Sequence, residues 1–217
     1  MTLKLYYHPL SSFCWKATIA LYENGTPFEK VVVHLNEEAS RAAFLEIWPI
    51  GQFPVLRDES RDWLVPESSI IVEYLDTHHP GRTRFVPDDP DLARQVRMRD
   101  RFFDLHVQVQ MQKIMDDRWR ADADKDRIGV ERARARLTTA LGMIEQAIGE
   151  EWVMGSEFTM ADVAAAPALF YANVAMPFGS AYPRTARYLE RLRNRPSFAR
   201  TLEEAAPDLR SVFGIVP

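Results

Sequence analysis

The first third of the chain consists of short apolar runs separated by turn residues. Alternating or continuous apolar runs predict strands at 3–7, 28–33, 53–56 and 62–65. The run at 28–33 holds three consecutive valines, which predicts a buried strand. Apolar positions at helical spacing predict helices over 12–24, 40–47 and 66–77. Parallel strands joined by a helix, then closed by a hairpin and a last helix, make a small α/β unit.

The pattern changes after residue 80. Residues 81–90 are rich in Pro, Gly, Asp and Arg, which predicts an interdomain linker. Apolar residues then recur at helical spacing, so an α/β domain over 1–80 is expected to precede an all-α domain over 91–217. Helices are predicted over 91–120, 127–149, 184–194 and 197–205, with Thr159 and Asp162 as a capping box that opens another. The apolar face of the first long helix would hold Met98, Phe102, Leu105 and Val109, and that of the second Ala133, Leu137, Leu141, Ile144 and Ile148.

Composition narrows the class of protein. The chain has 217 residues, of which 47% are hydrophobic and 27% charged, as expected for a folded protein. The net charge of -4 gives no support for a nucleic-acid partner, and no apolar run approaches the roughly 18 residues of a membrane span. The single cysteine, Cys14, excludes an internal disulfide, and the first residues do not resemble a signal peptide. We therefore expect a cytoplasmic protein without a membrane partner. The adjacent His78 and His79 make a poor metal site, so no metal is expected.

Ser11-Ser12-Phe13-Cys14 lies where the first strand leads into the first helix. A helix N-terminus offers unpaired N–H groups and a partial positive charge, which stabilise a thiolate. A free thiol has a pKa of about 8.5, so lowering that pKa by one unit raises the reactive fraction severalfold at neutral pH. A serine cannot supply the thiolate, but its hydroxyl can stabilise one brought by a cofactor. The alternative is that Ser11 or Ser12 only caps the helix.

Two further segments have features of a peptide-binding site. In Gly51-Gln52-Phe53-Pro54, a cis bond before Pro54 would leave the N–H and C=O of Phe53 free to pair with a peptide-like ligand. In Pro66-Glu67-Ser68, a carboxylate and a hydroxyl at a helix start can hold the ammonium and carboxylate of an amino acid. A favourably charged helix start without a ligand is the alternative.

Together these segments resemble the glutathione transferase family. The resemblance covers nearly the whole chain, through LYYHPLSSFCWKATIAL, GQFPVL, ESSIIVEYL and FTMADVAAAPAL in this order. It implies a thioredoxin-like α/β N-terminal domain, an all-α C-terminal domain, glutathione as co-substrate and a homodimer. Trp48-Pro49 stands where the family usually has Asn-Pro, so no role is assigned to that position.

The resemblance also implies roles for individual residues. Ser11 occupies the nucleophile's position of a Cys-x-x-Cys site, so it is expected to donate a hydrogen bond to the glutathione thiolate, with Ser12 as the alternative. Cys14 is then a buried structural residue, because a dithiol route needs a second cysteine. The expected glutathione contacts are Phe53 beside cis-Pro54 for the cysteinyl part, Glu67 and Ser68 for the γ-glutamyl end, and Gln52 and His34 for the glycyl or cysteinyl part.

The family binds its electrophile between the two domains, and the resemblance nominates Leu10, Phe13, His106, Met111, Met115 and Trp119 for that site. The predicted activity is conjugation of glutathione to a hydrophobic electrophile. SSFCWKATIAL is also similar to the SSCSWRVRIAL of zeta-class isomerases, so a glutathione-dependent cis-trans isomerase is a second prediction. A third is a non-catalytic binding protein, because a fold does not determine a function.

Overall fold

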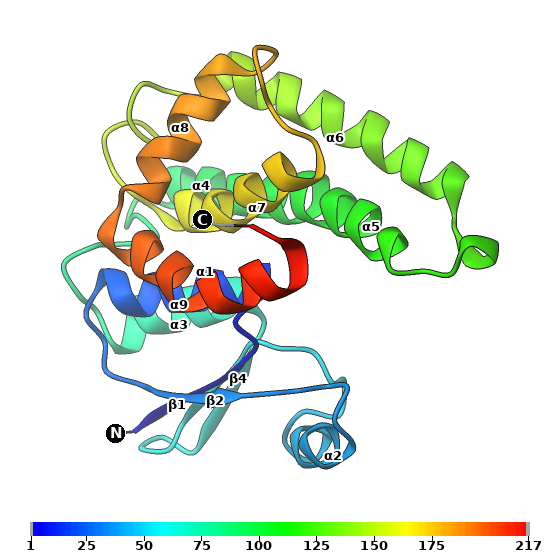
Figure 1. The fold of residues 1–217 in the computed structure, drawn as a ribbon. Coiled ribbons are helices and arrows are strands. Elements are labelled where there is room, and N and C mark those ends of the chain that lie inside the picture. The colour runs from blue at the N-terminus through cyan, green and yellow to red at the C-terminus, as the bar shows by residue number, and fades with distance from the viewer. Residues whose placement is uncertain (1, 216–217) are drawn as a thin grey trace. The chain divides into compact units, whose positions relative to one another are not determined.

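A computed structural model describes residues 2–215 (Figure 1). In the described chain, four strands form one sheet in the order β2-β1-β3-β4. These are β1 (Leu3–Tyr7), β2 (Glu29–Val32), β3 (Val55–Asp58) and β4 (Trp63–Pro66). β1 runs parallel to β2 and antiparallel to β3, and β3 and β4 form the expected antiparallel hairpin. Every strand predicted from the sequence is therefore present.

The burial of β2 differs from the sequence prediction. The run of valines predicted a buried strand, but β2 lies at the edge of the sheet and its side chains are exposed or half-buried. Val33, directly after the strand, is instead buried with Phe44 and Val55 in a small core. An edge strand is exposed because neighbouring chain covers it on one side only.

Three helices complete the α/β unit: α1 (Ser12–Glu23), α2 (Glu38–Ile47) and α3 (Ser68–His78). α1 and α3 pack side by side on one face of the sheet, and α2 lies on the other side (Figure 1). α1 ends at Glu23 with Asn24 as its C-cap, and Gly25 follows with a positive φ of 62°, a conformation that glycine adopts without steric cost.

The last helix, α9 (Pro196–Phe213), packs against α1. The hydroxyls of Thr18 and Thr201 share a hydrogen bond of 3.3 Å, and the Tyr22 hydroxyl donates to Glu204 at 2.6 Å. The first compact unit accordingly contains the chain up to Phe85 together with the residues from Pro196 onward. Chain order alone had grouped this helix with the helical domain.

The second compact unit, Val86–Arg195, is helical. Its helices are α4 (Pro90–Phe102), α5 (Val109–Arg118), α6 (Arg127–Ala147), α7 (Met160–Ala175) and α8 (Pro183–Arg193), with a short 3-10 helix at Asp122–Asp124. α7 is the central helix of this unit, because it packs against α4, α5 and α8. The apolar face predicted for α6 is buried at Ala133, Leu137, Leu141, Ile144 and Ile148, as expected. The predicted fold class, a thioredoxin-like domain followed by helices, is confirmed.

The first long helix differs in detail from its prediction. A π-helical turn at Phe103–Gln108 separates α4 from α5. Met98, Leu105 and Val109, which were predicted to form its apolar face, are exposed, and the buried side chains include Phe103 and Val107. A π-helical turn contains more residues than an α-helical turn, so the buried positions after it no longer follow the spacing of one uninterrupted helix.

Asp162 joins three parts of the helical unit. Its carboxylate accepts the Thr159 N–H at 2.9 Å, which completes the predicted capping box. It also accepts the Tyr188 hydroxyl of α8 at 2.6 Å and the Val153 N–H at 2.8 Å. Burial raises the pKa of Asp162, and these hydrogen bonds oppose that rise. None of the helices within residues 2–215 is both long and apolar enough to span a bilayer.

Candidate glutathione site

The strand register brings three separate loops to one edge of the sheet. Tyr6, near the end of β1, lies opposite Val55, the first residue of β3. Val55 in turn lies opposite Pro66, the last residue of β4. The residues just outside these pairs are the loop before α1, the Phe53–Pro54 segment and the start of α3. The three motifs found in the sequence therefore meet at one place in the fold.

Ser11 is the N-cap of α1. Its backbone is extended, and its Oγ accepts the Cys14 N–H at 3.3 Å. A hydroxyl oxygen that accepts through a lone pair keeps its own hydrogen for donation. Ser12 is the first residue of the helix and is only 8% exposed, whereas Ser11 is half-buried. Of the two serines, Ser11 is the more accessible to a ligand.

Cys14 is fully buried in the first turn of α1. Burial raises the pKa of its thiol to about 12, while hydrogen bonds from Ser11 and from the His8 backbone act in the opposite direction. A thiol with such a pKa stays protonated at neutral pH and is a poor nucleophile. The environment of Cys14 is that of a structural cysteine.

The Phe53–Pro54 peptide bond is cis. Phe53 is half-buried and its ring packs against Phe44, with the centroids 6.4 Å apart. Among residues 2–215, neither its N–H nor its C=O takes part in a backbone hydrogen bond. Gln52 is exposed beside it, and Gly51 turns the chain with a φ of 70°. The Phe53 backbone is thus available to a ligand.

Glu67 has an unusual backbone conformation. Its φ is 70°, a backbone angle that residues other than glycine rarely adopt. It is the N-cap of α3 and makes no capping side-chain hydrogen bond. Ser68, the first residue of α3, is buried. Strained residues of this kind cluster at ligand sites, because the strain persists only where the surroundings enforce it. The carboxylate of Glu67 remains exposed beside the N–H groups of the helix start.

Two residues near this site make contacts that the sequence pattern does not predict. Lys16 in α1 is only 1% exposed, and its ammonium donates to Ser69 Oγ in the first turn of α3 at 2.8 Å. The His8 ring stacks on Phe53 with the centroids 5.9 Å apart, and meets His34 edge-on at 5.7 Å. Lys16 stands between apolar residues of the first helix, and this position in the sequence could have indicated a buried, paired ammonium. No residue near His8 in the sequence indicates its contacts with Phe53 and His34.

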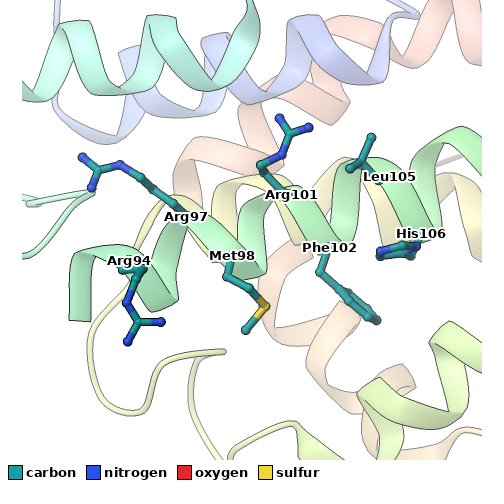
Figure 2. Close-up of a pocket in the computed structure, with 7 residues that line it drawn as sticks. All are labelled: Arg94, Arg97, Met98, Arg101, Phe102, Leu105 and His106. Atoms are coloured by element: carbon teal, nitrogen blue, oxygen red, sulfur yellow. The ribbon is translucent and has the colours of Figure 1, made fainter. Parts of the chain in front are cut away.

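The residues nominated for the electrophile occupy different environments. Leu10 and Phe13 are half-buried beside Ser11 in the first unit. In the second unit, Met111 and Met115 are buried, whereas Trp119, at the end of α5, is 65% exposed. His106 is exposed and lines a shallow depression of about 420 Å³ (Figure 2). The structure therefore does not place His106 on the buried face that Met111 and Met115 share.

That depression is lined by residues of α4 and the π-helical turn. In Figure 2, Met98, Phe102 and His106 lie along one side of the helix, and Arg101 and Leu105 lie along the other. The rings of Phe102 and His106 are 5.2 Å apart. Within the described residues, no three His, Cys, Asp or Glu side chains gather as metal ligands would. The complete lining is Arg94, Arg97, Met98, Arg101, Phe102, Leu105 and His106.

Comparison with known proteins agrees with this geometry. Residues 5–83 match the family model for the glutathione S-transferase N-terminal domain, and residues 128–191 match that for the C-terminal domain. The chain is 31% identical over 149 residues to the glutathione S-transferase-like protein LUC7 of a Fusarium species. The aligned residues cover 68% of this chain and 64% of that protein. It is 26% identical over 209 residues to a probable maleylacetoacetate isomerase of Caenorhabditis elegans, with 94% of each chain covered.

A solved structure extends the comparison to the fold. A glutathione S-transferase of Methylobacterium radiotolerans, crystallised in complex with glutathione sulfonate, superposes with a TM-score of 0.80 at 29% identity. The match covers 92% of this chain and 93% of that one. A thioredoxin-like unit followed by a helical unit, with a serine at the start of α1, defines the class of protein. The chain belongs to the glutathione S-transferase family.

Proposed function

We propose that this protein joins the sulfur of glutathione to an electrophilic carbon of a hydrophobic substrate. The observation that carries the proposal is the Ser11 hydroxyl, whose oxygen accepts the Cys14 N–H through a lone pair, so that its hydrogen can turn from the Cys14 thiol to donate to a bound sulfur. Phe53 offers its backbone to the cysteinyl part of glutathione, with Pro54 beside it. Glu67 and Ser68 receive the ammonium and carboxylate of the γ-glutamyl end. Gln52 and His34 complete the contacts.

The reaction needs a thiolate at neutral pH. The Ser11 hydroxyl and the N-terminus of α1 favour the anionic sulfur, so the thiol proton passes to solvent when glutathione binds. The sulfur then forms a bond to the electrophilic carbon, and the leaving group departs with the electrons of its former bond. Where the electrophile is an activated alkene, the neighbouring carbon takes a proton instead. Binding both reactants also orients them for attack. The electrophile residues proposed are Leu10, Phe13, His106, Met111, Met115 and Trp119.

Turnover with glutathione and a generic aromatic halide tests this function. Wild-type protein should conjugate the two, and Ser11→Ala should lose at least about tenfold in kcat/KM at neutral pH, because a shift of one pKa unit is tenfold in the thiolate equilibrium. Absence of turnover with several electrophiles, although glutathione binds, would leave no support for conjugation.

A second activity has specific support. SSFCWKATIAL is similar to the corresponding segment of zeta-class isomerases, and the chain resembles a probable maleylacetoacetate isomerase over most of its length. In such a reaction the thiolate adds to a conjugated double bond, rotation follows, and elimination restores the thiolate. Conversion of a maleyl to a fumaryl diketo acid distinguishes this activity from conjugation.

We also propose that the protein is a cytoplasmic homodimer that acts in detoxification. Family membership supports this assembly, and light scattering during gel filtration measures it. A non-catalytic ligand carrier is the remaining alternative. Calorimetry separates the two, because a carrier would bind an apolar ligand without binding glutathione.

A further inference from the structure

His8 holds the loop that leads into α1 through three hydrogen bonds. Its carbonyl accepts the Ser11 N–H at 3.0 Å, and its own N–H donates to Cys14 Sγ at 3.5 Å. Its ring Nδ1 accepts the Leu10 N–H at 3.2 Å. A ring nitrogen that accepts a hydrogen bond carries no proton, so this ring is neutral with its hydrogen on Nε2. The ring thus fixes the backbone directly before Ser11.

The same ring also contacts the second loop of the site. It is nearly parallel to the Phe53 ring, with an interplanar angle of 18°, and nearly perpendicular to the His34 ring, at 89°. One side chain therefore touches both the loop that carries the serine hydroxyl and the residue whose backbone is available to a ligand. A shift of His8 would change the distance between these two parts of the site.

We propose that His8 is a positioning residue, whose neutral ring holds the Leu10–Ser11 backbone so that the Ser11 hydroxyl faces the bound thiol, and that protonation of Nδ1 releases this hold. The proposal rests on the function proposed above for Ser11. An imidazolium Nδ1 is a donor, so it cannot accept the Leu10 N–H. Acid should therefore loosen the loop before it unfolds the protein.

The groups around His8 agree with a ring that stays neutral near neutral pH. Burial lowers the pKa of His8, His34 lowers it further, and Asp208 in α9 opposes both. Cys14 in α1 adds no charge, because its pKa is raised to about 12. His8 thus takes up a proton only below its ordinary pKa of about 6.5.

Two substitutions separate the role of the acceptor from that of the ring. His8→Asn provides an oxygen that accepts the N–H two residues onward, as in an Asx turn, and it does not titrate. His8→Phe keeps an aromatic ring beside Phe53 but has no acceptor. The control is His78→Phe in α3, because His78 contacts only the aromatic pair Trp63 and Tyr74 among the ring contacts described.

The measurements are kcat/KM against pH and the hydrogen exchange of the Leu10 amide, followed by NMR in the full-length protein. At about pH 7, His8→Phe should lose about tenfold in kcat/KM, His8→Asn less than about threefold, and His78→Phe nothing measurable. As the pH falls, the wild-type protein should lose the hydrogen bond from the Leu10 N–H while His8→Asn keeps it, so the ratio of His8→Asn to wild-type kcat/KM should rise. Ionisation of the glutathione thiol cancels in that ratio. Leu10 exchange should be about tenfold faster in His8→Phe.

The outcomes separate this proposal from the function on which it rests. A His8→Phe protein with wild-type kcat/KM and wild-type Leu10 exchange would overturn the role of His8, as would a ratio that stays flat with pH. If no protein turns over but Leu10 exchange depends on His8 as described, the hold on the loop stands and the transferase activity fails.

Discussion

The amide N–H of Cys14 donates to the Ser11 Oγ across 3.3 Å, so the hydroxyl oxygen caps α1 through a lone pair, while its hydrogen can turn from the Cys14 thiol to a ligand. This bond links the local structure to the chemistry. The extended backbone of Ser11 and the start of the helix at Ser12 place the hydroxyl at the N-terminal end of α1.

Two substitutions at Ser11 separate capping from catalysis. Ser11→Ala should lower the free energy of unfolding by about 1 kcal/mol, whereas Ser11→Gly should lower it by only a few tenths. Both should lose at least about tenfold in kcat/KM, because neither retains a hydroxyl. Urea unfolding and steady-state kinetics measure the two effects. If activity followed stability instead, with Ser11→Gly nearly fully active, the hydroxyl would have no catalytic role.

Replacement of Cys14 tests its structural role. Cys14→Ala should retain conjugation within about threefold and lose about 1–2 kcal/mol of stability through the small cavity it leaves. A thiol reagent should modify native wild-type protein slowly and unfolded protein quickly, because burial raises the pKa of this thiol to about 12. Rapid modification of the native protein together with loss of turnover would assign Cys14 a chemical role.

The positive φ of Glu67 predicts that two substitutions differ in their effect on stability but weaken glutathione binding equally. Glu67→Gly relieves the strain that Glu67→Ala retains, so the glycine variant should be the more stable of the two by about 1 kcal/mol. Both should bind glutathione about tenfold more weakly, because both lack the carboxylate that receives the ammonium. Calorimetry with glutathione and urea unfolding provide the comparison. Unchanged affinity in both variants would remove Glu67 from the site.

Asp58 is a buried carboxylate whose effect on stability depends on pH. It is fully buried and accepts hydrogen bonds from Ser60 at 2.6 Å, from Tyr74 at 2.8 Å and from His79 at 3.0 Å. Burial raises its pKa, but the hydrogen bonds outweigh burial, so the pKa is lowered overall. The unfolded chain therefore binds the proton more readily. The resulting stability is present above the unfolded pKa of about 3.9 and is lost as the pH falls below it.

Asp58→Asn should accordingly lower the free energy of unfolding by about 2–4 kcal/mol near neutral pH, because an amide cannot accept hydrogen bonds from all these donors. The difference from wild type should narrow as the pH falls below about 4. Urea unfolding at several pH values tests both statements, with the exposed Asp62→Asn as the control. A difference between wild type and Asp58→Asn that is independent of pH would contradict the account.

The sequence pattern predicted the secondary structure of the first unit well, because its strands are short apolar runs between turn residues. It did not predict the order of the strands, which depends on pairing between distant segments, so the prediction of a buried strand at the valines of β2 is wrong. The π-helical turn at Phe103–Gln108 was also missed, because helical spacing assumes one uninterrupted period. The contact of α9 with α1 likewise depends on tertiary packing.

The candidate site was predicted where local chemistry is distinctive, as at Ser11 and at the cis bond before Pro54. The roles assigned to these residues remain predictions. The positive φ of Glu67 carries no local signal, because a glutamate does not favour that conformation. The ring contacts of His8 with Phe53 and His34 join segments that are distant in the sequence, so they depend on the strand register.

The pKa of the glutathione thiol in the complex tests the central claim most directly. The ultraviolet absorbance of the thiolate, followed against pH in wild type and in Ser11→Gly, gives that value. The account predicts a pKa at least about one unit below the free value of about 8.5 in wild type, and a return toward the free value in Ser11→Gly. A bound thiol that titrates as free glutathione does, or one equally acidic in both proteins, would contradict it.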